Sequence, residues 1–269
     1  MNANQTKAVR PETALPKMLF LDHEAFPNEG YFWHGKREVD IIKVTKPKII
    51  ASTAWNWLGE DDIHAAALPM FRGYRKDPRN NKALIKKVIS LYEKADIIVG
   101  HNIDGYDDRM TNTEIARNDL SAMLPPPHKT IDTLKIARTK FRFNGNTLQE
   151  LGEFLGLGVK VAHEGFPLWE KCMAGDPDAW KRFVAYNIGD VVLLKKIYFK
   201  FRPWITNHPN MNGTENAERK NCPQCGAHRS RMIRRGYFFT VTGRVLRFQC
   251  KDCGKWARGA IIRREWKFK

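Results

Sequence analysis

The sequence predicts an α/β domain followed by a small β-rich module that binds a metal ion. Three observations support this prediction: strand-like and helix-like segments alternate over residues 17–205, the chain turns polar over residues 206–220, and two Cys-x-x-Cys pairs follow within residues 221–269. A chain of 269 residues can hold one sizeable domain and one small module. We expect residues 1–16, which are polar, to form a flexible tail, and residues 206–220 to form a linker.

The elements of the first domain follow from runs and periodicities of apolar residues. Short strands are expected at residues 18–21, 49–55 and 97–99. Helices are expected at residues 81–95, 147–158 and 178–201, where apolar side chains recur every three or four positions. Thr147 and Glu150 have the spacing of a capping box at the start of the second helix.

Positive charge is concentrated at the C-terminal end. The formal net charge is +17, and residues 217–269 contain 15 Lys and Arg against 3 Asp and Glu. Clustered cations favour a polyanionic partner, because phosphate contacts release counterions. No run of 18 apolar residues occurs and residues 1–17 lack the apolar centre of a signal peptide, so we expect a cytoplasmic protein with no membrane partner, in the host cytoplasm if the protein is viral.

The cysteines indicate a structural zinc site. Cys222 and Cys225 form one Cys-x-x-Cys-Gly sequence, and Cys250 and Cys253 form a second, separated from the first by 24 residues. Four thiolates suit a tetrahedral Zn²⁺, and each following glycine permits the tight turn that directs both sulfurs to one ion. The β-rich, arginine-rich segment between them predicts a zinc ribbon, whereas Cys172 is expected to be a structural thiol.

Carboxylates follow or interrupt apolar segments at three places in the first domain. Asp22 and Glu24 follow an apolar strand and lie two residues apart, so they point to the same side of it. Asp107 follows the strand at 97–99 and is preceded by Asn102 and Tyr106. Asp22 and Glu24 would repel each other unless a cation lay between them, and oxygen ligands suit Mg²⁺ or Mn²⁺.

The third place is the long helix at 178–201. Tyr186 and Asp190 are four residues apart and share one helical face, which is otherwise apolar. A buried aspartate there is costly unless it is paired or binds a metal ion. A helix that began near Asn102 would place Asp104, Asp107 and Asp108 on one face. Asp104 is therefore the second choice, after Asp107, for the carboxylate that this segment contributes.

In this order the motifs resemble the DEDDy branch of the DnaQ-like 3′–5′ exonucleases. The residues that carry the resemblance are Asp22, Glu24, Asn102, Tyr106, Asp107, Tyr186 and Asp190. The sequence departs from the usual pattern at His23, where an apolar residue is common, and at Ala25, where threonine is common. The resemblance implies the ribonuclease H-like fold, with a mixed central sheet flanked by helices, over residues 17–201.

The resemblance also implies a reaction and roles for individual residues. Asp22, Glu24, Asp107 and Asp190 would hold two Mg²⁺ or Mn²⁺ ions, which activate a water molecule and stabilise the charge that develops on the phosphate. Tyr186 would orient the attacking water. Asn102 and Tyr106 would contact the substrate, and Asp132 is expected to have a structural or supporting role.

Three hypotheses about function follow. The first is a metal-dependent 3′–5′ exonuclease acting on DNA, or on RNA as the second candidate, with a zinc ribbon that binds nucleic acid. The second is a structure-selective endonuclease on the same fold, and the third is a non-catalytic nucleic-acid-binding adaptor. The presence of all four carboxylates and the tyrosine favours an enzyme. A chain of this length contains no polymerase domain, so a proofreading role would need a separate polymerase, and a recombination protein is the alternative partner.

Overall fold

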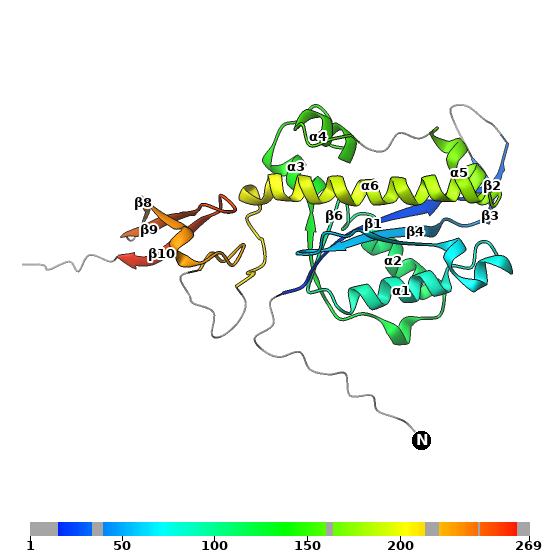
Figure 1. Cartoon of the computed structure of the whole chain (residues 1–269), viewed down its shortest axis with the longest axis horizontal. Coiled ribbons are helices and arrows are strands. Elements are labelled where there is room, and N and C mark those ends of the chain that lie inside the picture. Colours follow the sequence, from blue (N-terminus) through cyan, green and yellow to red (C-terminus); the bar gives the residue numbers. More distant parts are fainter. Residues whose placement is uncertain (1–15, 34–39, 160–163, 213–220, 242, 263–269) are drawn as a thin grey trace, which may run out of the picture. The chain divides into compact units, whose positions relative to one another are not determined.

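A computed structural model describes residues 16–33, 40–159, 164–212, 221–241 and 243–262 (Figure 1). Within it the chain divides into two compact units, Lys17–Tyr198 and a C-terminal unit that begins at Phe199. The predicted tail, apart from Pro16, lies outside the described residues, as do residues 213–220 of the predicted linker. The domain boundaries expected from the sequence therefore stay predictions.

The first unit is built on a mixed five-stranded sheet with the order β5-β4-β1-β6-β7. Its strands are β1 (Met18–Phe26), β4 (Ile49–Trp57), β5 (His64–Ala67), β6 (Ile97–Gly100) and β7 (Lys129–Asp132). The pairs β1–β4 and β4–β5 are antiparallel, whereas β1–β6 and β6–β7 are parallel. A separate hairpin of β2 (Glu29–Phe32) and β3 (Ile41–Lys46) joins β1 to β4.

Helices cover both faces of this sheet (Figure 1). They are α1 (Lys82–Tyr92), α2 (Asp107–Arg117), α3 (Thr133–Lys140), α4 (Leu148–Phe154), α5 (Phe166–Met173) and α6 (Pro177–Phe201). Short 3-10 helices are η1 (Leu68–Met70), η2 (Arg72–Arg75), η3 (Ser121–Met123), η4 (Arg202–Trp204) and η5 (Arg229–Arg231). The mixed sheet flanked by helices confirms the predicted α/β fold class.

Alternation along β1 explains how one strand contacts two helix layers. Phe20 packs edge-on against Tyr198 of α6, with ring centroids 5.2 Å apart, and Phe26 packs against Phe183 of the same helix. His23 points the other way and contacts Thr111 of α2. Successive side chains of a strand point to opposite faces, so α6 covers one face of β1 and α2 the other.

The predicted end of the first strand was wrong. β1 does not stop at Leu21 but continues to Phe26, so that Asp22 and Glu24 lie within the strand. The continuation is possible because β4 pairs with β1 as far as Phe26, with an irregularity in register after Glu24. Polar side chains in the middle of a strand conceal its length when apolar runs alone are used to place it.

The helix that follows β6 begins at Asp107 and not near Asn102, so the condition under which Asp104 would share its face is not met. Asn102 adopts a left-handed backbone conformation, with φ of 69°, and its carbonyl accepts hydrogen bonds from the backbone N–H groups of Gly105 and Tyr106. This turn separates β6 from α2. The predicted capping box of α4 is confirmed: the Thr147 hydroxyl accepts from the Glu150 backbone, and the Glu150 carboxylate accepts from the Thr147 backbone.

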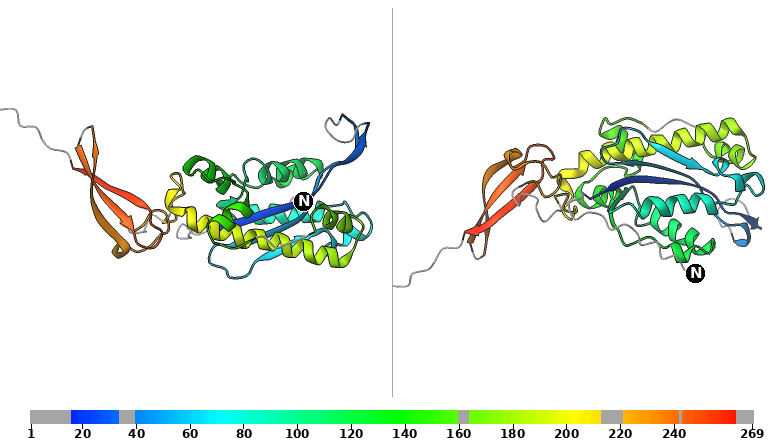
Figure 2. Two further views of the ribbon diagram at one scale, coloured as in Figure 1. Left: turned by 90° about the horizontal axis from the view of Figure 1, so that it is seen from above. Right: turned by 60° about the horizontal axis from the view of Figure 1, so that its bottom comes forward.

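The C-terminal unit contains a three-stranded antiparallel sheet with the order β10-β9-β8. Its strands are β8 (Met232–Thr240), β9 (Gly243–Cys250) and β10 (Trp256–Ile262) (Figure 2). The β-rich character predicted for this region is confirmed. No helix among the described residues is long and apolar enough to cross a membrane.

Candidate metal centres

Three carboxylates converge between β1 and α6. Oxygen atoms of Asp22, Glu24 and Asp190 all lie within 4.8 Å of one another. Asp22 and Glu24 are half-buried on β1, whereas Asp190 on α6 is buried, with 2% of its surface exposed. The structure therefore brings together three of the four carboxylates that the sequence indicated, from segments more than 160 residues apart.

The sheet leaves room for this cluster because β1 extends beyond its parallel neighbour. Pairing between β1 and β6 ends at Phe20 and Val99, and β6 itself ends at Gly100. Beyond that point β4 continues to pair with β1 on the other side. The carboxylates thus lie at the edge of the sheet where parallel strands end, a location at which α/β proteins commonly place their sites.

Asn187 fixes Asp22 in this position. Its side-chain Nδ2 donates to Asp22 Oδ2 at 2.7 Å, and its Oδ1 accepts from the Ser52 hydroxyl of β4 at 2.9 Å. Both Asn187 and Ser52 are fully buried. Sequence reasoning missed Asn187. The available signal was its position three residues before Asp190, which places both side chains on one face of α6.

Asp107 lies beside the cluster. It is not part of the three-carboxylate group, and its Oδ1 instead accepts from the backbone N–H of His23 at 3.1 Å. That N–H belongs to the part of β1 beyond β6, so the aspartate binds the strand edge where a parallel neighbour would have been. Burial raises the pKa of Asp107 to about 7. Its role as a metal ligand stays a prediction.

His23, between the two β1 carboxylates, connects three elements of the first unit. Nδ1 is 2.9 Å from the Thr53 hydroxyl of β4, and Nε2 is 3.0 Å from the Thr111 hydroxyl of α2. Burial lowers the pKa of His23 to about 3, so the imidazole is neutral and exchanges hydrogen bonds with both hydroxyls. An apolar residue here could fill the same space but could not make these two bonds.

Tyr106 faces the carboxylates from the turn before α2. Burial, followed by the negative charges of Asp107, Glu24 and Asp22, raises the pKa of Tyr106 to about 12. Its hydroxyl therefore keeps its proton. The exposed Lys48 places its Nζ 5.3 Å from the centroid of the Tyr106 ring, so a cation lies next to this ring.

Tyr186 lies one turn before Asp190 on α6 and is 8% exposed. Its ring packs edge-on against Trp169 of α5, with centroids 6.0 Å apart. Trp169 in turn donates its indole N–H to the carbonyl of Ala25, the residue after Glu24. Tyr186 is thus held near the strand that carries the carboxylates, and its role with water stays a prediction.

The remaining sequence-predicted residues shape the turn between β6 and α2. Asp132 is the N-cap of α3, where its carboxylate accepts from the backbone of Leu134 and Lys135 and also from the backbone N–H of Asn102. A structural role was expected for it. Asp104 forms an ion pair with Lys135 at 2.7 Å and does not belong to the carboxylate cluster.

The acidic cluster has the composition of a site for a hard divalent cation. Three carboxylates within 4.8 Å of one another repel, and partial burial strengthens the repulsion. A divalent ion with a preference for oxygen ligands offsets that repulsion, and Mg²⁺ and Mn²⁺ meet this description. Asp22, Glu24 and Asp190 are the residues that would hold it.

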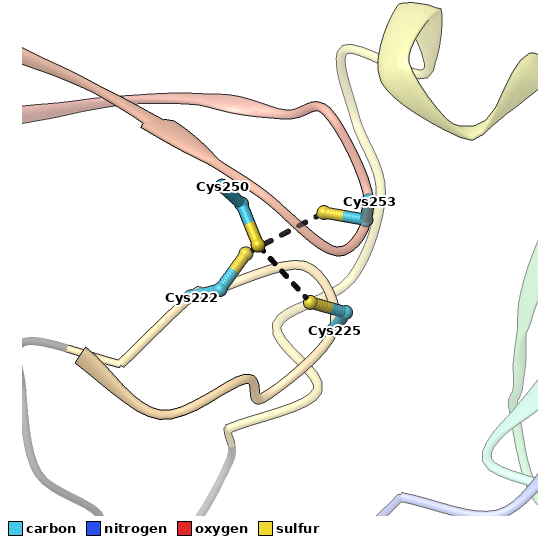
Figure 3. Close-up of side chains that lie close together, drawn as sticks. All are labelled: Cys222, Cys225, Cys250 and Cys253. Atoms are coloured by element: carbon cyan, nitrogen blue, oxygen red, sulfur yellow. Dashed lines mark hydrogen bonds between the residues drawn. The ribbon is translucent and has the colours of Figure 1, made fainter. Parts of the chain in front are cut away.

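The four paired cysteines form a second cluster, of different chemistry. Sulfur atoms of Cys222, Cys225, Cys250 and Cys253 lie within 4.8 Å of one another and point toward a common centre (Figure 3). The Sγ–Sγ distances are 3.6 Å for Cys222–Cys253 and 3.7 Å for Cys225–Cys250. Four sulfur ligands in this arrangement suit a structural Zn²⁺.

The two cysteine turns have the same backbone geometry, as the repeated sequence predicted. Gly226 and Gly254 both have φ near 70°, a conformation that glycine adopts readily. The N–H of each glycine donates to the carbonyl of the first cysteine of its pair, at 2.9 Å for Cys222 and 3.0 Å for Cys250. Each turn thereby directs two sulfurs to the same side.

Arginines cover aromatic rings on the C-terminal sheet. The Arg258 guanidinium lies 3.8 Å from the centroid of Phe238, and Arg247 lies 5.0 Å from that of Trp256. In the β9–β10 register Arg247 is opposite Arg258, so these two arginines are on one face. The face therefore presents positive charge and aromatic surface together, a combination that suits nucleic acid.

Two comparisons with known proteins agree with this architecture, and no curated protein matches the chain. The model of the RNase_H superfamily matches residues 58–202, slightly more than half of the sequence. The fold is similar to that of the family B DNA polymerase from the hyperthermophilic archaeon Pyrobaculum calidifontis, with a TM-score of 0.52 and 16% sequence identity. That match covers 71% of this chain and 25% of the polymerase.

Replacing Asn187 by alanine is expected to weaken metal binding. Without the amide, Asp22 loses the donor that orients it, and we expect the affinity for Mn²⁺ to fall about 10–100-fold. Isothermal titration calorimetry measures the change. Gln149→Ala, which removes an exposed amide on α4, should leave the affinity unchanged, and equal affinities for all three proteins would contradict the role of Asn187.

The cysteine cluster is expected to retain one zinc ion per purified chain. Cys225→Ser removes one ligand and should lower the zinc content, measured by elemental analysis, to well below one per chain. Cys172→Ser is the control for a cysteine substitution outside the cluster, because Cys172 lies on α5 in the first unit. Full zinc content in Cys225→Ser would rule out a site formed by four cysteines.

Proposed function

The chain belongs to the RNase_H superfamily, and we propose that it is a metal-dependent 3′–5′ exonuclease of the DEDDy type that acts on DNA. Membership of this superfamily supports a nuclease activity for the chain. The observation that carries the finer proposal is the convergence of Asp22, Glu24 and Asp190 within 4.8 Å, while Asp107, the first residue of α2, accepts a hydrogen bond from the backbone of His23 between them. These are the four carboxylates of the motif set, in the chain order of that type.

The protein residues have separate tasks in this proposal. Asp22, Glu24, Asp107 and Asp190 hold two divalent ions, Mg²⁺ or Mn²⁺, and Asn187 keeps Asp22 in place. When bound, the metal ions lower the pKa of a coordinated water and offset the charge that develops on the phosphate.

Tyrosine side chains supply positioning. Tyr186, one helical turn from Asp190, orients the attacking water through its hydroxyl. Tyr106 keeps its proton at neutral pH because burial and the nearby carboxylates raise its pKa, so it donates a hydrogen bond to a phosphate oxygen. Lys48 beside the Tyr106 ring adds a positive charge where the substrate backbone approaches, and Asn102 contacts the substrate from the preceding turn.

The C-terminal module binds nucleic acid and thereby raises the local concentration of substrate. Arg247 and Arg258 supply cations, while Trp256 and Phe238 supply rings on which bases stack. The zinc ion held by the four cysteines stabilises this small sheet. DNA is the proposed substrate and RNA the second candidate, and a separate polymerase or recombination protein is the proposed partner.

Asp22→Asn and Asp190→Asn are each expected to abolish hydrolysis of end-labelled single-stranded DNA in Mn²⁺, because each removes a charge that holds the metal. Tyr186→Phe should lower kcat while metal affinity stays the same. Denaturing gels of the products measure the rates, and isothermal titration calorimetry with Mn²⁺ measures the metal affinity. Asp104→Asn is the matched control, since Asp104 pairs with Lys135 outside the cluster and its loss should leave the rate near that of the wild type.

The same gels separate the alternatives. A ladder that shortens from the 3′ end supports an exonuclease, and internal cuts in branched DNA would assign an endonuclease. Binding without hydrolysis in the wild type, in either Mg²⁺ or Mn²⁺, would assign a non-catalytic adaptor. Hydrolysis that survives in both Asp22→Asn and Asp190→Asn would contradict the site.

A further inference from the structure

The β2–β3 hairpin carries an exposed aromatic surface directly after the carboxylate strand. Tyr31, Phe32 and Trp33, called here the hairpin aromatics, are 66%, 57% and 79% exposed. Every residue of β3 is exposed as well. Three consecutive exposed aromatic side chains are unusual on a soluble domain and indicate an interaction surface. Figure 2 shows this hairpin, in blue, projecting from the sheet.

The hairpin is firmly attached at its base. Glu29 is bound by Lys46 at 2.7 Å and by Arg79 at 3.0 Å. Arg79 also donates to the carbonyl of Pro47, and the backbone of Lys48 donates to the Asn28 side chain at 2.6 Å. These contacts fix the direction in which the strands leave the sheet, so that the aromatic rings are presented by a supported element.

The hairpin carries a cation beside the aromatic rings. Of its two strand lysines, Lys46 is paired with Glu29, the carboxylate of these strands, and Lys43 adds one positive charge. Tyr31 is directly opposite Lys43 in the β2–β3 register, so a ring and an ammonium group are neighbours on one face. Rings combined with cations suit single-stranded nucleic acid, whose bases stack while its phosphates pair.

The hairpin is also continuous with the proposed active site. Glu29 follows Glu24 by five residues, and an extended chain covers about 3.6 Å per residue, so the hairpin starts no more than about 18 Å from the carboxylates along the chain. Lys48, which follows β3, lies beside the ring of Tyr106. The segment that carries the exposed rings thus starts a few residues after Glu24 and ends beside a residue proposed to contact the substrate.

We propose that the hairpin aromatics stack against unpaired bases of the nucleic acid strand whose end lies at the carboxylate cluster. This inference rests on the proposed function, because it assigns the substrate of that site as single-stranded at the bases next to the cleaved bond. The hairpin holds these bases, while the carboxylates and their metal ions act on the backbone.

Binding in the absence of catalysis tests the proposal. The full chain, with its structural zinc retained, is titrated with a fluorescent single-stranded oligonucleotide in buffer without Mg²⁺ or Mn²⁺, and anisotropy gives the Kd. The variant Tyr31→Ala/Phe32→Ala/Trp33→Ala should raise the Kd at least about tenfold, since stacking of each base contributes substantially to affinity. The loss should be similar at each salt concentration, because stacking releases no counterions. Leu124→Ala, 63% exposed outside the hairpin, is the matched control and should bind like the wild type.

An abasic oligonucleotide of the same length identifies the contacted group. The wild type should lose affinity for it, and the triple variant should lose clearly less, because only the C-terminal module then remains to stack on bases. The proposal would be overturned if the triple substitution left the Kd for the normal strand unchanged. It would also be overturned if the substitution raised the Kd for the abasic strand by the same factor as for the normal strand. Wild-type self-association that the triple variant abolishes without loss of DNA affinity would assign the surface to a second copy of the chain.

The two proposals fail separately in this design. Hydrolysis of DNA by the wild type, together with an unchanged Kd of the triple variant, would overturn the role of the hairpin alone. Base-dependent binding through the hairpin without Mn²⁺-dependent hydrolysis would overturn the nuclease proposal and leave the stacking surface in place.

Discussion

The continuation of β1 past the end of β6 is the constraint on which the acidic site depends. Up to Phe20 the strand is paired on both sides and fully buried, and from Asp22 onward only β4 remains beside it. The open side accepts the carboxylate of Asp107, which binds the backbone at His23. If β6 were three residues longer, its backbone would compete for that N–H, and the start of α2 would have no place at the strand edge.

Holding several negative charges at one partly buried place is costly, and the structure offsets the cost in two ways. Buried neutral groups fix the geometry: Asn187 and Ser52 orient Asp22, while His23 joins β1 to β4 and α2 through two threonine hydroxyls. A divalent cation held by these carboxylates would offset the charge. The cysteine cluster of the second unit is a softer site, and its thiolate ligands would favour zinc.

Much of this arrangement could be predicted from the sequence, because periodicity and motif spacing are local. The mixed α/β class, the capping box at Thr147 and the glycine turns of the cysteine pairs depend on neighbouring residues and were predicted correctly. The extent of β1 depends on a partner distant in sequence, and the apolar run alone made the predicted strand too short. Asn187 and His23 were not assigned for the same reason, since their functions are visible only when β4 and α2 are in place.

The central claim is that repulsion among Asp22, Glu24 and Asp190 is offset by a bound divalent cation. Thermal unfolding of the wild type and of Asp190→Asn, each with and without added Mn²⁺ and with no chelator so that zinc stays on the cysteine cluster, tests it most directly. A ligand that binds only the folded state raises its stability, so the Tm of the wild type should rise in Mn²⁺ and that of the variant should not. Without Mn²⁺ the variant should unfold at the same or a higher temperature, because one of three repelling charges is gone. A wild type that Mn²⁺ does not stabilise, or a variant that it stabilises equally, would contradict the account.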